Sequence, residues 1–400
     1  MFPLKKILLI VLFIVVAAGF GYGIYFLFFR VAPMEEVADV YEEYIPPSGL
    51  PGAGGATPKP AEAEIPAGVS LIAQGGLTFV SALTNANTLG AAINQDGRTM
   101  SFYNKSDGKF YRLTPSGDIT ELSNKTFYNV DKVAWSPNSD KAVLEYPDGS
   151  NIIYDFATEK QITLPKHWEE FGFSPDGEKI AAKSMDADPD NRWLVTVNSD
   201  GTNTQPIELL GNNANKVQVA YSPTGQVVGF SSTGEAQGFS RQDILLLGLN
   251  GENFKALRVN GLGFEGKWSK SGERLLYSVY SADSDYKPMI WITDASGENI
   301  GTNRRNLSLN TWANKCAFSD DVTLYCAVPQ TMDRGAGFQQ KLSEKTPDVF
   351  YKVDIRSGLK TLLAVPSGQY TAKNLMVSSD EQFLFFTNTS NGAIEKIQLK

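Results

Sequence analysis

The stretch that decides the fold reads WSPNSDKAVLEY and covers residues 135–146. Its centre, SPNS, contains a proline that presets φ for the first turn position and an asparagine that can bond the local backbone. Apolar and aromatic residues stand on both sides of this turn, as they do in β-strands. The stretch therefore predicts two antiparallel strands joined by a tight turn.

The same turn occurs seven times along the chain. Its copies are NQDG at 94–97, SPNS at 136–139, SPDG at 174–177, SPTG at 222–225, SKSG at 269–272, SDDV at 319–322 and SSDE at 378–381. Successive copies lie 38 to 59 residues apart, which brackets the roughly 40 to 50 residues of a four-stranded propeller blade. A second turn with glycine follows in five units, at Gly117, Gly201, Gly251, Gly297 and Gly358. We therefore predict an all-β fold, a seven-bladed β-propeller of four-stranded antiparallel blades, over residues 69–400.

The last unit contains only three predicted strands, at 375–377, 383–387 and 394–399. A further strand-like stretch, GLTFVSAL at 76–83, stands alone before the first turn. We expect this stretch to pair with the last blade and to close the ring, because closure removes exposed sheet edges.

An apolar run of 23 residues at 7–29 is long enough, at 1.5 Å per residue, to cross a hydrocarbon core of about 30 Å. Lys5 and Lys6 precede it, and this charge bias predicts a cytoplasmic N-terminus. We predict a cytoplasmic stub at 1–6, a single-pass transmembrane helix at 7–29 and a propeller on the periplasmic or extracellular side of the cell membrane. The alternative is a cleaved signal peptide, whose apolar region would be about 7 to 15 residues long.

Residues 30–68 join this predicted helix to the first strands. They begin with an acidic segment, MEEVADVYEEY at 34–44, and continue with six prolines among glycine and alanine. Such a composition does not bury a core. We predict a semi-extended stalk.

The composition argues against several functions. A formal net charge of −8 without clustered basic residues does not suit a nucleic-acid partner. One histidine, His167, and two cysteines leave few residues for nucleophilic or zinc chemistry. We therefore expect no cofactor and no enzymatic activity.

The turns in WSPNSDKAVLEY, FSPDGEKIAAK and YSPTGQVVGF resemble the repeats of TolB-like bacterial propellers and of the propeller in the prolyl oligopeptidase family. The resemblance covers about residues 69–400 and implies a propeller that serves as a scaffold, a ligand binder or an enzyme gate. In the peptidase family a hydrolase domain with a G-x-S-x-G motif accompanies the propeller, and this chain does not contain that motif.

Cys316 and Cys326 flank the sixth turn at equal distance from its tip. Residues so placed face each other across an antiparallel pair, where Cβ atoms lie about 4.5 to 5.5 Å apart. An oxidising compartment then favours a disulfide with a structural role. The alternative is two reduced, buried cysteines on neighbouring strands.

Asp186, Asp188 and Asp190 alternate like the start of a calcium-binding loop. The rest of that motif is missing, because no glycine follows and the twelfth position is Val197. The two interpretations are a metal site and a solvated acidic loop.

The connection between the second and third strands lengthens in units three to six, and antiparallel order places these connections on one face. The longest is an insertion at 329–346, which we expect to be flexible and to contribute little to stability. Aromatic and arginine side chains dominate interface energetics. The predicted binding residues are Arg334 and Phe338 in this insertion and Asp283, Asp285 and Tyr286 in the preceding long connection. Neutral drift in surface loops is the alternative explanation.

These features predict a non-enzymatic protein-interaction or scaffold module of the cell envelope, with another envelope protein as its partner. A propeller that binds or senses a glycan or another small ligand is the alternative. A hydrolase is the third possibility, and it needs two carboxyl groups about 5 to 10 Å apart.

Overall fold

The computed structural model describes residue 19 and residues 65–400, apart from 86, 236, 237 and 239. The predicted cytoplasmic stub, the transmembrane helix except for residue 19, and nearly all of the stalk lie outside this part of the chain, so they stay predictions. Among the residues that are described, no helix is long and apolar enough to cross a membrane.

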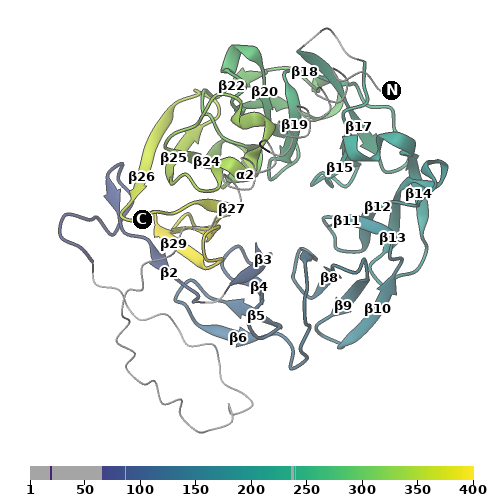
Figure 1. Cartoon of the computed structure of the whole chain (residues 1–400), viewed down its shortest axis with the longest axis horizontal. Helices are drawn as coiled ribbons and strands as arrows, with labels where there is room; N and C mark the ends of the chain where they lie inside the picture. Colours follow the sequence, from purple (N-terminus) through teal and green to yellow (C-terminus); the bar gives the residue numbers. More distant parts are fainter. Residues whose placement is uncertain (1–18, 20–64, 86, 236–237, 239) are drawn as a thin grey trace, which may run out of the picture. The chain divides into compact units, whose positions relative to one another are not determined.

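Seven sheets stand around a common axis and form a β-propeller, as Figure 1 shows. In each blade the first strand lies innermost and the others follow outward, and the four main strands are antiparallel to their neighbours. The predicted all-β, seven-bladed architecture with four-stranded antiparallel blades is therefore confirmed.

The blades are numbered here in chain order. Blade 1 comprises β3 (Thr88–Ile93), β4 (Met100–Asn104), β5 (Lys109–Leu113) and β6 (Ile119–Glu121); blade 2 comprises β7 (Lys132–Trp135), β8 (Lys141–Glu145), β9 (Asn151–Asp155) and β10 (Lys160–Leu164). Blade 3 comprises β11 (Trp168–Phe173), β12 (Lys179–Ser184), β13 (Trp193–Asn198) and β14 (Gln205–Leu209); blade 4 comprises β15 (Val217–Val219), β16 (Val227–Ser231), β17 (Arg241–Gly248) and β18 (Leu257–Asn260). Blade 5 comprises β19 (Leu262–Trp268), β20 (Arg274–Tyr280), β21 (Met289–Asp294) and β22 (Arg305–Asn306).

Blade 6 comprises β23 (Cys316–Phe318), β24 (Thr323–Pro329), β25 (Asp348–Asp354) and β26 (Lys360–Pro366), with β1 (Leu77–Thr78) at its outer edge. Blade 7 comprises β27 (Ala372–Val377), β28 (Phe383–Asn388), β29 (Ile394–Gln398) and β2 (Ser81–Ala82). Short helical turns lie in the connections: η1 (Pro189–Asn191), η2 (Gly211–Lys216), η3 (Ala282–Ser284), η4 (Gly297–Asn299), η5 (Ala313–Lys315), η6 (Ala336–Phe338) and α2 (Gln340–Ser343).

The repeated turn joins the first and second strands of every blade, as predicted. In blade 3 the backbone N–H of Gly177 donates to the carbonyl of Ser174 at 2.9 Å, and Gly177 has a φ of +75°. Sequence reasoning gave no role to the serine that opens the turn. The structure shows its role. The buried hydroxyl of Ser174 accepts a hydrogen bond from the backbone N–H of Lys179 at 2.9 Å, so a side chain of the turn itself pairs this N–H group. Four further turns show the same contact, from Ser136, Ser222, Ser269 and Ser378.

The N-terminal strands close the ring in two steps. As expected, β2 pairs antiparallel with β29, Ser81 lying opposite Lys396, and supplies the outer strand of blade 7. The expectation of one strand over 76–83 was wrong, since β1 pairs in parallel with β26 and gives blade 6 a fifth strand. Val80 lies between β1 and β2 and is buried in the core that blades 6 and 7 share. This buried contact explains why the segment divides between two blades.

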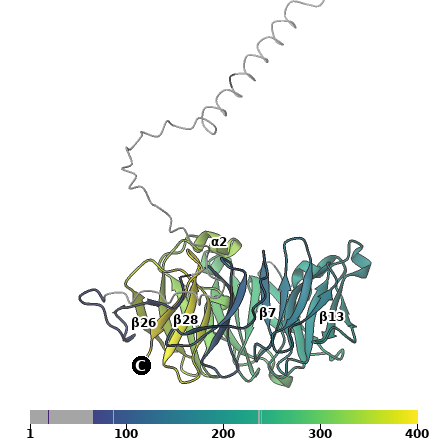
Figure 2. The ribbon, with the colours of Figure 1, turned by 90° about the horizontal axis from the view of Figure 1, so that it is seen from below.

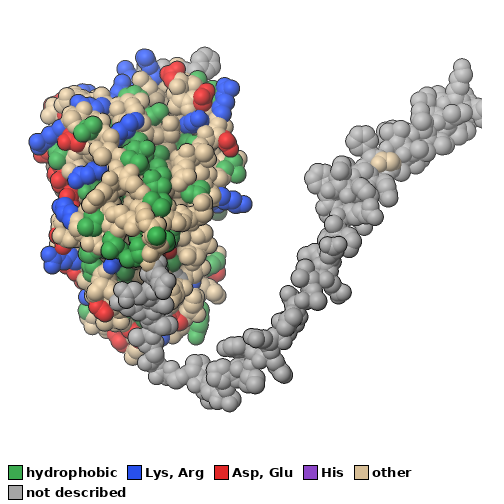
Figure 3. All heavy atoms as spheres, turned by 90° about the vertical axis from the view of Figure 1, so that its left-hand side faces the viewer, with side chains coloured by type: hydrophobic (Ala, Val, Ile, Leu, Met, Phe, Trp, Pro, Cys, Tyr) green, Lys and Arg blue, Asp and Glu red, His purple; other side chains and the backbone are tan. Residues whose placement is uncertain are grey.

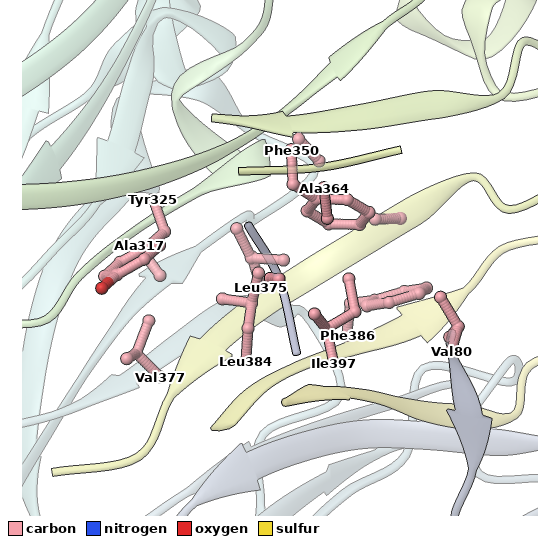
Figure 4. Packing of buried hydrophobic residues seen from close by; sticks show 13 residues of the cluster. Val80, Ala317, Tyr325, Phe350, Ala364, Leu375, Val377, Leu384, Phe386 and Ile397 are labelled. Carbon is pink, nitrogen blue, oxygen red and sulfur yellow. The ribbon is translucent and has the colours of Figure 1, made fainter. Parts of the chain in front are cut away.

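Apolar side chains from neighbouring blades fill the space between them. Figure 4 shows the cluster between blades 6 and 7, where Phe350 of β25 and Phe386 of β28 lie with their ring centroids 5.2 Å apart. Leu384 and Ile397 pack in the same cluster and are fully buried. The blades are therefore held to one another by ordinary hydrophobic burial.

The predicted disulfide between Cys316 and Cys326 is confirmed. The two residues pair directly across β23 and β24, and both are fully buried. No free cysteine remains. The bond ties the innermost strand of blade 6 to its neighbour.

We expect the double substitution Cys316→Ala and Cys326→Ala to lower the free energy of unfolding by about 2 to 3 kcal/mol. The bond closes a short loop, with a sequence separation of 10 residues, so its entropic effect on the unfolded chain is moderate. Denaturant titration of the oxidised wild type, the reduced wild type and the variant measures the effect. Equal midpoints for the oxidised wild type and the variant would contradict a stabilising role.

A buried ion pair lies beside this disulfide. Lys315, at the end of η5, places its Nζ 2.7 Å from both carboxylate oxygens of Asp348, the first residue of β25. One oxygen of Asp348 also accepts the backbone N–H of Ala372 at 2.7 Å, so the pair links blade 6 to the first strand of blade 7. Both charged side chains are almost completely shielded from solvent.

Glu395 is a buried carboxyl of a different kind. It lies in β29 between Phe386 of β28 and Ala82 of β2, and it is 3% exposed. Its Oε2 atom has no hydrogen-bond partner among the described residues. Burial raises the pKa of this carboxyl to about 7.

Candidate functional site

The long connections between second and third strands gather on one face of the propeller, as the sequence predicted. They span 185–192 in blade 3, 232–240 in blade 4, 281–288 in blade 5 and 330–347 in blade 6. The connections between first and second strands, and between third and fourth, lie on the opposite face, because neighbouring strands run antiparallel. Figure 2 shows α2, which belongs to the longest connection, at one face of the ring.

The insertion in blade 6 is folded onto the long connection of blade 5. The backbone N–H of Gly335 donates to the carbonyl of Asp285 at 2.9 Å, and that of Gly337 donates to the carbonyl of Tyr286 at 2.8 Å. Gly337 is required here, because an added Cβ would lie 2.6 Å from the Tyr280 side chain. These hydrogen bonds hold the insertion against blade 5, a contact that the expectation of a flexible insertion did not include. Gly337 allows the close approach to blade 5, whereas Gly335 adopts a left-handed φ of +82° and lies nearest to Phe338 of its own segment.

The other half of this contact has an unusual backbone. Asp285 and Tyr286 both adopt left-handed conformations, with φ of +54° and +56°. Such values are rare for a bulky residue like tyrosine and are kept only where neighbouring contacts hold them. The carbonyls of these two residues are the ones that accept the N–H groups of the insertion. The two loops therefore stabilise each other.

Three aromatic rings meet where the loops touch. The Phe338 ring centroid lies 4.8 Å from that of Tyr280 and 5.3 Å from that of Tyr286. Phe338 nevertheless stays 58% exposed, and Leu342 of α2 is 69% exposed. Arg334 and Asp285 form an exposed ion pair at 4.0 Å, which contributes little stability.

Four of the five predicted binding residues thus come together, namely Asp285, Tyr286, Arg334 and Phe338. Tyr280 and Leu342 belong to the same surface, and sequence reasoning missed both. Tyr280 ends β20 and looked like a strand residue. Leu342 stands in α2, which the non-helical Gln339 separates from η6 and Phe338, so no helical spacing in the sequence marks it.

The fifth residue, Asp283, lines a separate pocket of about 340 Å³ between blades 4 and 5. Its walls combine polar side chains with the apolar Val279, Met289 and Trp291, and the polar ones include Arg241, Asn260, Ser281 and Asn306. The volume and this mixture suit a small polar ligand.

The alternating aspartates of blade 3 serve their own loop. The carboxylate of Asp186 accepts the backbone N–H of Asp188 at 2.9 Å, and that of Asp188 accepts the N–H of Asp190 at 3.1 Å at the start of η1. Across the described part of the chain, no three His, Cys, Asp or Glu side chains are grouped so that they could hold a metal ion. The local hydrogen bonds explain the alternation as a turn motif.

Two charged side chains on the innermost strand of blade 5 have strongly shifted pKa values. Burial raises the pKa of Glu265 to about 7 and lowers the pKa of Lys267 to about 8. The Nζ of Lys267 donates to the carbonyl of Cys316 at 2.6 Å, which links blade 5 to blade 6. This contact gives Lys267 a structural role in the ring.

No protein-family model matches the chain, and no curated protein matches it either. Solved structures share the fold. An oligogalacturonate lyase in complex with manganese is 15% identical with a TM-score of 0.58, over 80% of this chain and 93% of the lyase. Oligogalacturonate lyase from Vibrio parahaemolyticus is 12% identical with a TM-score of 0.53, over 80% and 93%. Hydrazine synthase from Kuenenia stuttgartiensis is 12% identical with a TM-score of 0.53, over 78% and 96%.

At these identities the likeness defines a class of fold alone. Residues 65–400 form a seven-bladed β-propeller whose solved neighbours include the oligogalacturonate lyases. Shared propeller architecture does not carry an activity with it.

Proposed function

We propose that this chain is a membrane-anchored, extracytoplasmic β-propeller that acts as a non-enzymatic recognition or scaffold module. The partner is another cell-envelope protein, and it binds the surface formed by the insertion of blade 6 and the long connection of blade 5. One observation carries the proposal: Phe338 and Leu342 are held in exposed positions on a folded insertion.

Exposed apolar side chains on an ordered element are well suited to binding a protein. Their burial releases free energy of about 25 cal/mol per Å² of apolar surface. The hydrogen bonds from Gly335 and Gly337 fix the segment before a partner arrives, so little conformational entropy is lost on binding. Arg334 beside the rings adds a charged group of the kind found in interface hot spots.

A second candidate is a propeller that binds a glycan or another small polar ligand. The pocket of about 340 Å³ lined by Asp283, Trp291 and Asn306 favours it, because an aromatic face with hydrogen-bonding groups suits a sugar ring. The solved lyases are enzymes, and that likeness leans toward a catalytic function. Because the lyases are 15% identical or less to this chain, their catalytic function is a weaker guide than the exposed apolar surface of the insertion.

We expect the double substitution Phe338→Ser and Leu342→Ser to reduce partner capture by at least about tenfold. The test uses a membrane-impermeant crosslinker on intact cells that produce the full-length chain, followed by identification of the attached proteins. Leu359→Ser is the matched control, because Leu359 is 65% exposed and lies in the turn between β25 and β26, on the opposite face.

Capture that stays equal in the double variant and the control would exclude this surface. Absence of any crosslink to the propeller, together with labelling of a known outer-face protein, would contradict the extracytoplasmic location. Melting of the double variant at the wild-type temperature shows that the change acts on binding.

A further inference from the structure

Four arginines gather in one groove on the face opposite the insertion. Arg274 begins β20, Arg304 and Arg305 lie at the start of β22, and Arg356 lies in the turn after β25. They line a groove of about 350 Å³ between blades 5 and 6, with Asp294 as the one acidic side chain in its lining. The lining therefore carries a net charge of +3 in a chain whose net charge is −8.

The choice of residue type is informative. The chain contains 11 arginines and 25 lysines, yet all four basic residues of the groove are arginines. On the edge shown in Figure 3, by comparison, basic and acidic side chains are interspersed. Arginine is the residue that binds carboxylate and phosphate groups through two parallel N–H donors, whereas lysine acts as a point charge.

Contacts with the protein orient the guanidinium groups of Arg304 and Arg305 without neutralising them. Nη1 of Arg305 donates to the carbonyl of Ile355 at 3.2 Å and also to that of Arg356, and so joins blades 5 and 6. Nη1 of Arg304 donates to the carbonyl of Arg258 at 2.8 Å, and its guanidinium lies 5.8 Å from the ring centroid of Trp291. Carbonyl oxygens and aromatic faces carry no full negative charge, so the positive charge of both side chains remains.

Three aspartates interact with the four arginines: Asp294 and Asp321 with Arg274, and Asp354 with Arg356. Nε of Arg274 lies 4.0 Å from a carboxylate oxygen of Asp294, whose other oxygen accepts from Asn303 at 2.6 Å. Asp354, in the same turn as Arg356, accepts the backbone N–H of Ser357 at 2.8 Å. Like charges that are brought this close repel one another, and a bound anion would remove the repulsion.

We propose that this groove binds a multiply charged oxyanion, a phosphate or carboxylate group of an anionic ligand. Each guanidinium offers five N–H donors. Arg304 and Arg305 each donate from Nη1 to backbone carbonyls, and Nη1 of Arg274 donates to the carbonyl of Asp321 at 3.4 Å, so most donors of these three side chains remain for a ligand. The volume lies in the range of small-molecule sites. The groove is separate from the surface of the insertion, so this proposal stands whether or not a protein partner binds there.

The test is calorimetric titration of the purified full-length chain in detergent with pyrophosphate and with citrate. We expect binding of at least one of them, weakened at least tenfold in Arg304→Gln/Arg356→Gln and weakened further by added salt. The matched control is Arg98→Gln/Lys166→Gln, which removes two exposed basic side chains elsewhere and should change the affinity less than twofold. Arg356→Lys keeps the positive charge but removes the planar guanidinium with its paired N–H donors, so we expect a loss of affinity between those of the control and of the double variant.

The pattern of binding identifies the source of the anion. Pyrophosphate alone points to a phosphate ligand, citrate alone points to a carboxylate ligand, and binding of both supports a general oxyanion site. Absence of heat with both anions at millimolar concentration overturns the proposal. Equal weakening in the groove variant and the control overturns it as well, because the effect would then come from net charge. A thermal melt of each variant confirms that the ring is intact.

Discussion

We expect Asp348→Ala to lower the free energy of unfolding by about 3 to 5 kcal/mol, the largest effect of any single substitution considered for this chain. The change leaves the ammonium group of Lys315 buried without its counter-charge. It also removes the acceptor of the Ala372 N–H, which lies at the junction of blades 6 and 7. A buried charge without a partner is far more costly than a lost surface pair. Denaturant titration of the purified chain measures the loss.

The matched control is Asp148→Ala. Asp148 pairs with Lys166 at 3.4 Å, but both side chains are more than 60% exposed, so we expect no measurable loss of stability. The double variant Lys315→Met/Asp348→Leu should regain much of the stability, because apolar groups replace both charges. If Asp348→Ala costs no more than the control, the buried pair has no special weight.

The second large effect is a gain of stability. We expect Glu395→Gln to raise the free energy of unfolding by about 2 to 3 kcal/mol at pH 8 and to leave it nearly unchanged at pH 4. Burial raises the pKa of Glu395 to about 7 from the usual 4.5. Between these values the folded chain binds the proton more tightly than the unfolded chain does. Stability from this group is therefore present below pH 4.5 and is lost as the pH rises toward 7.

The experiment compares denaturation midpoints of wild type and variant at pH 4, 6 and 8. Glu298→Gln is the control, since Glu298 is an exposed glutamate in η4. A stabilisation by Glu395→Gln that is the same at pH 4 and pH 8 would show that the gain does not come from ionisation. A loss of stability at pH 8 would show that the hydrogen bond between Asn388 and the carboxylate outweighs the cost of burying it.

The architecture was predictable because its signals are local. Small polar residues, with proline or glycine in most copies, determine each turn within four positions, and Gly177 shows the left-handed conformation that closes the turn in blade 3. The disulfide was predictable for the same reason, since Cys316 and Cys326 flank one such turn. The parallel pairing of β1 with β26 could not be predicted, because a strand of only two residues is too short to show a periodic pattern in the sequence.

The surfaces depend on residues that are distant in the sequence. Phe338 and Tyr286 could be singled out as residue types that bind partners, but nothing in the sequence shows that the two loops hydrogen-bond to each other. The arginine groove joins positions 274, 304, 305 and 356 from two blades, and it appears only once the blades are placed side by side. The pairing of Lys315 with Asp348 is hidden in the same way, because an 18-residue connection separates β24 from β25.

The way the ring closes also determines when the molecule can be completed during synthesis. The outer strand of blade 7, β2, is among the first parts of the propeller to leave the ribosome, while its partner β29 is among the last. Until β29 has been synthesised, blades 1 to 6 can form in order, but β2 has no strand with which to pair. Pairings between positions so far apart form late and slowly. The nascent chain therefore exposes an open arc to chaperones and proteases until its final residues arrive.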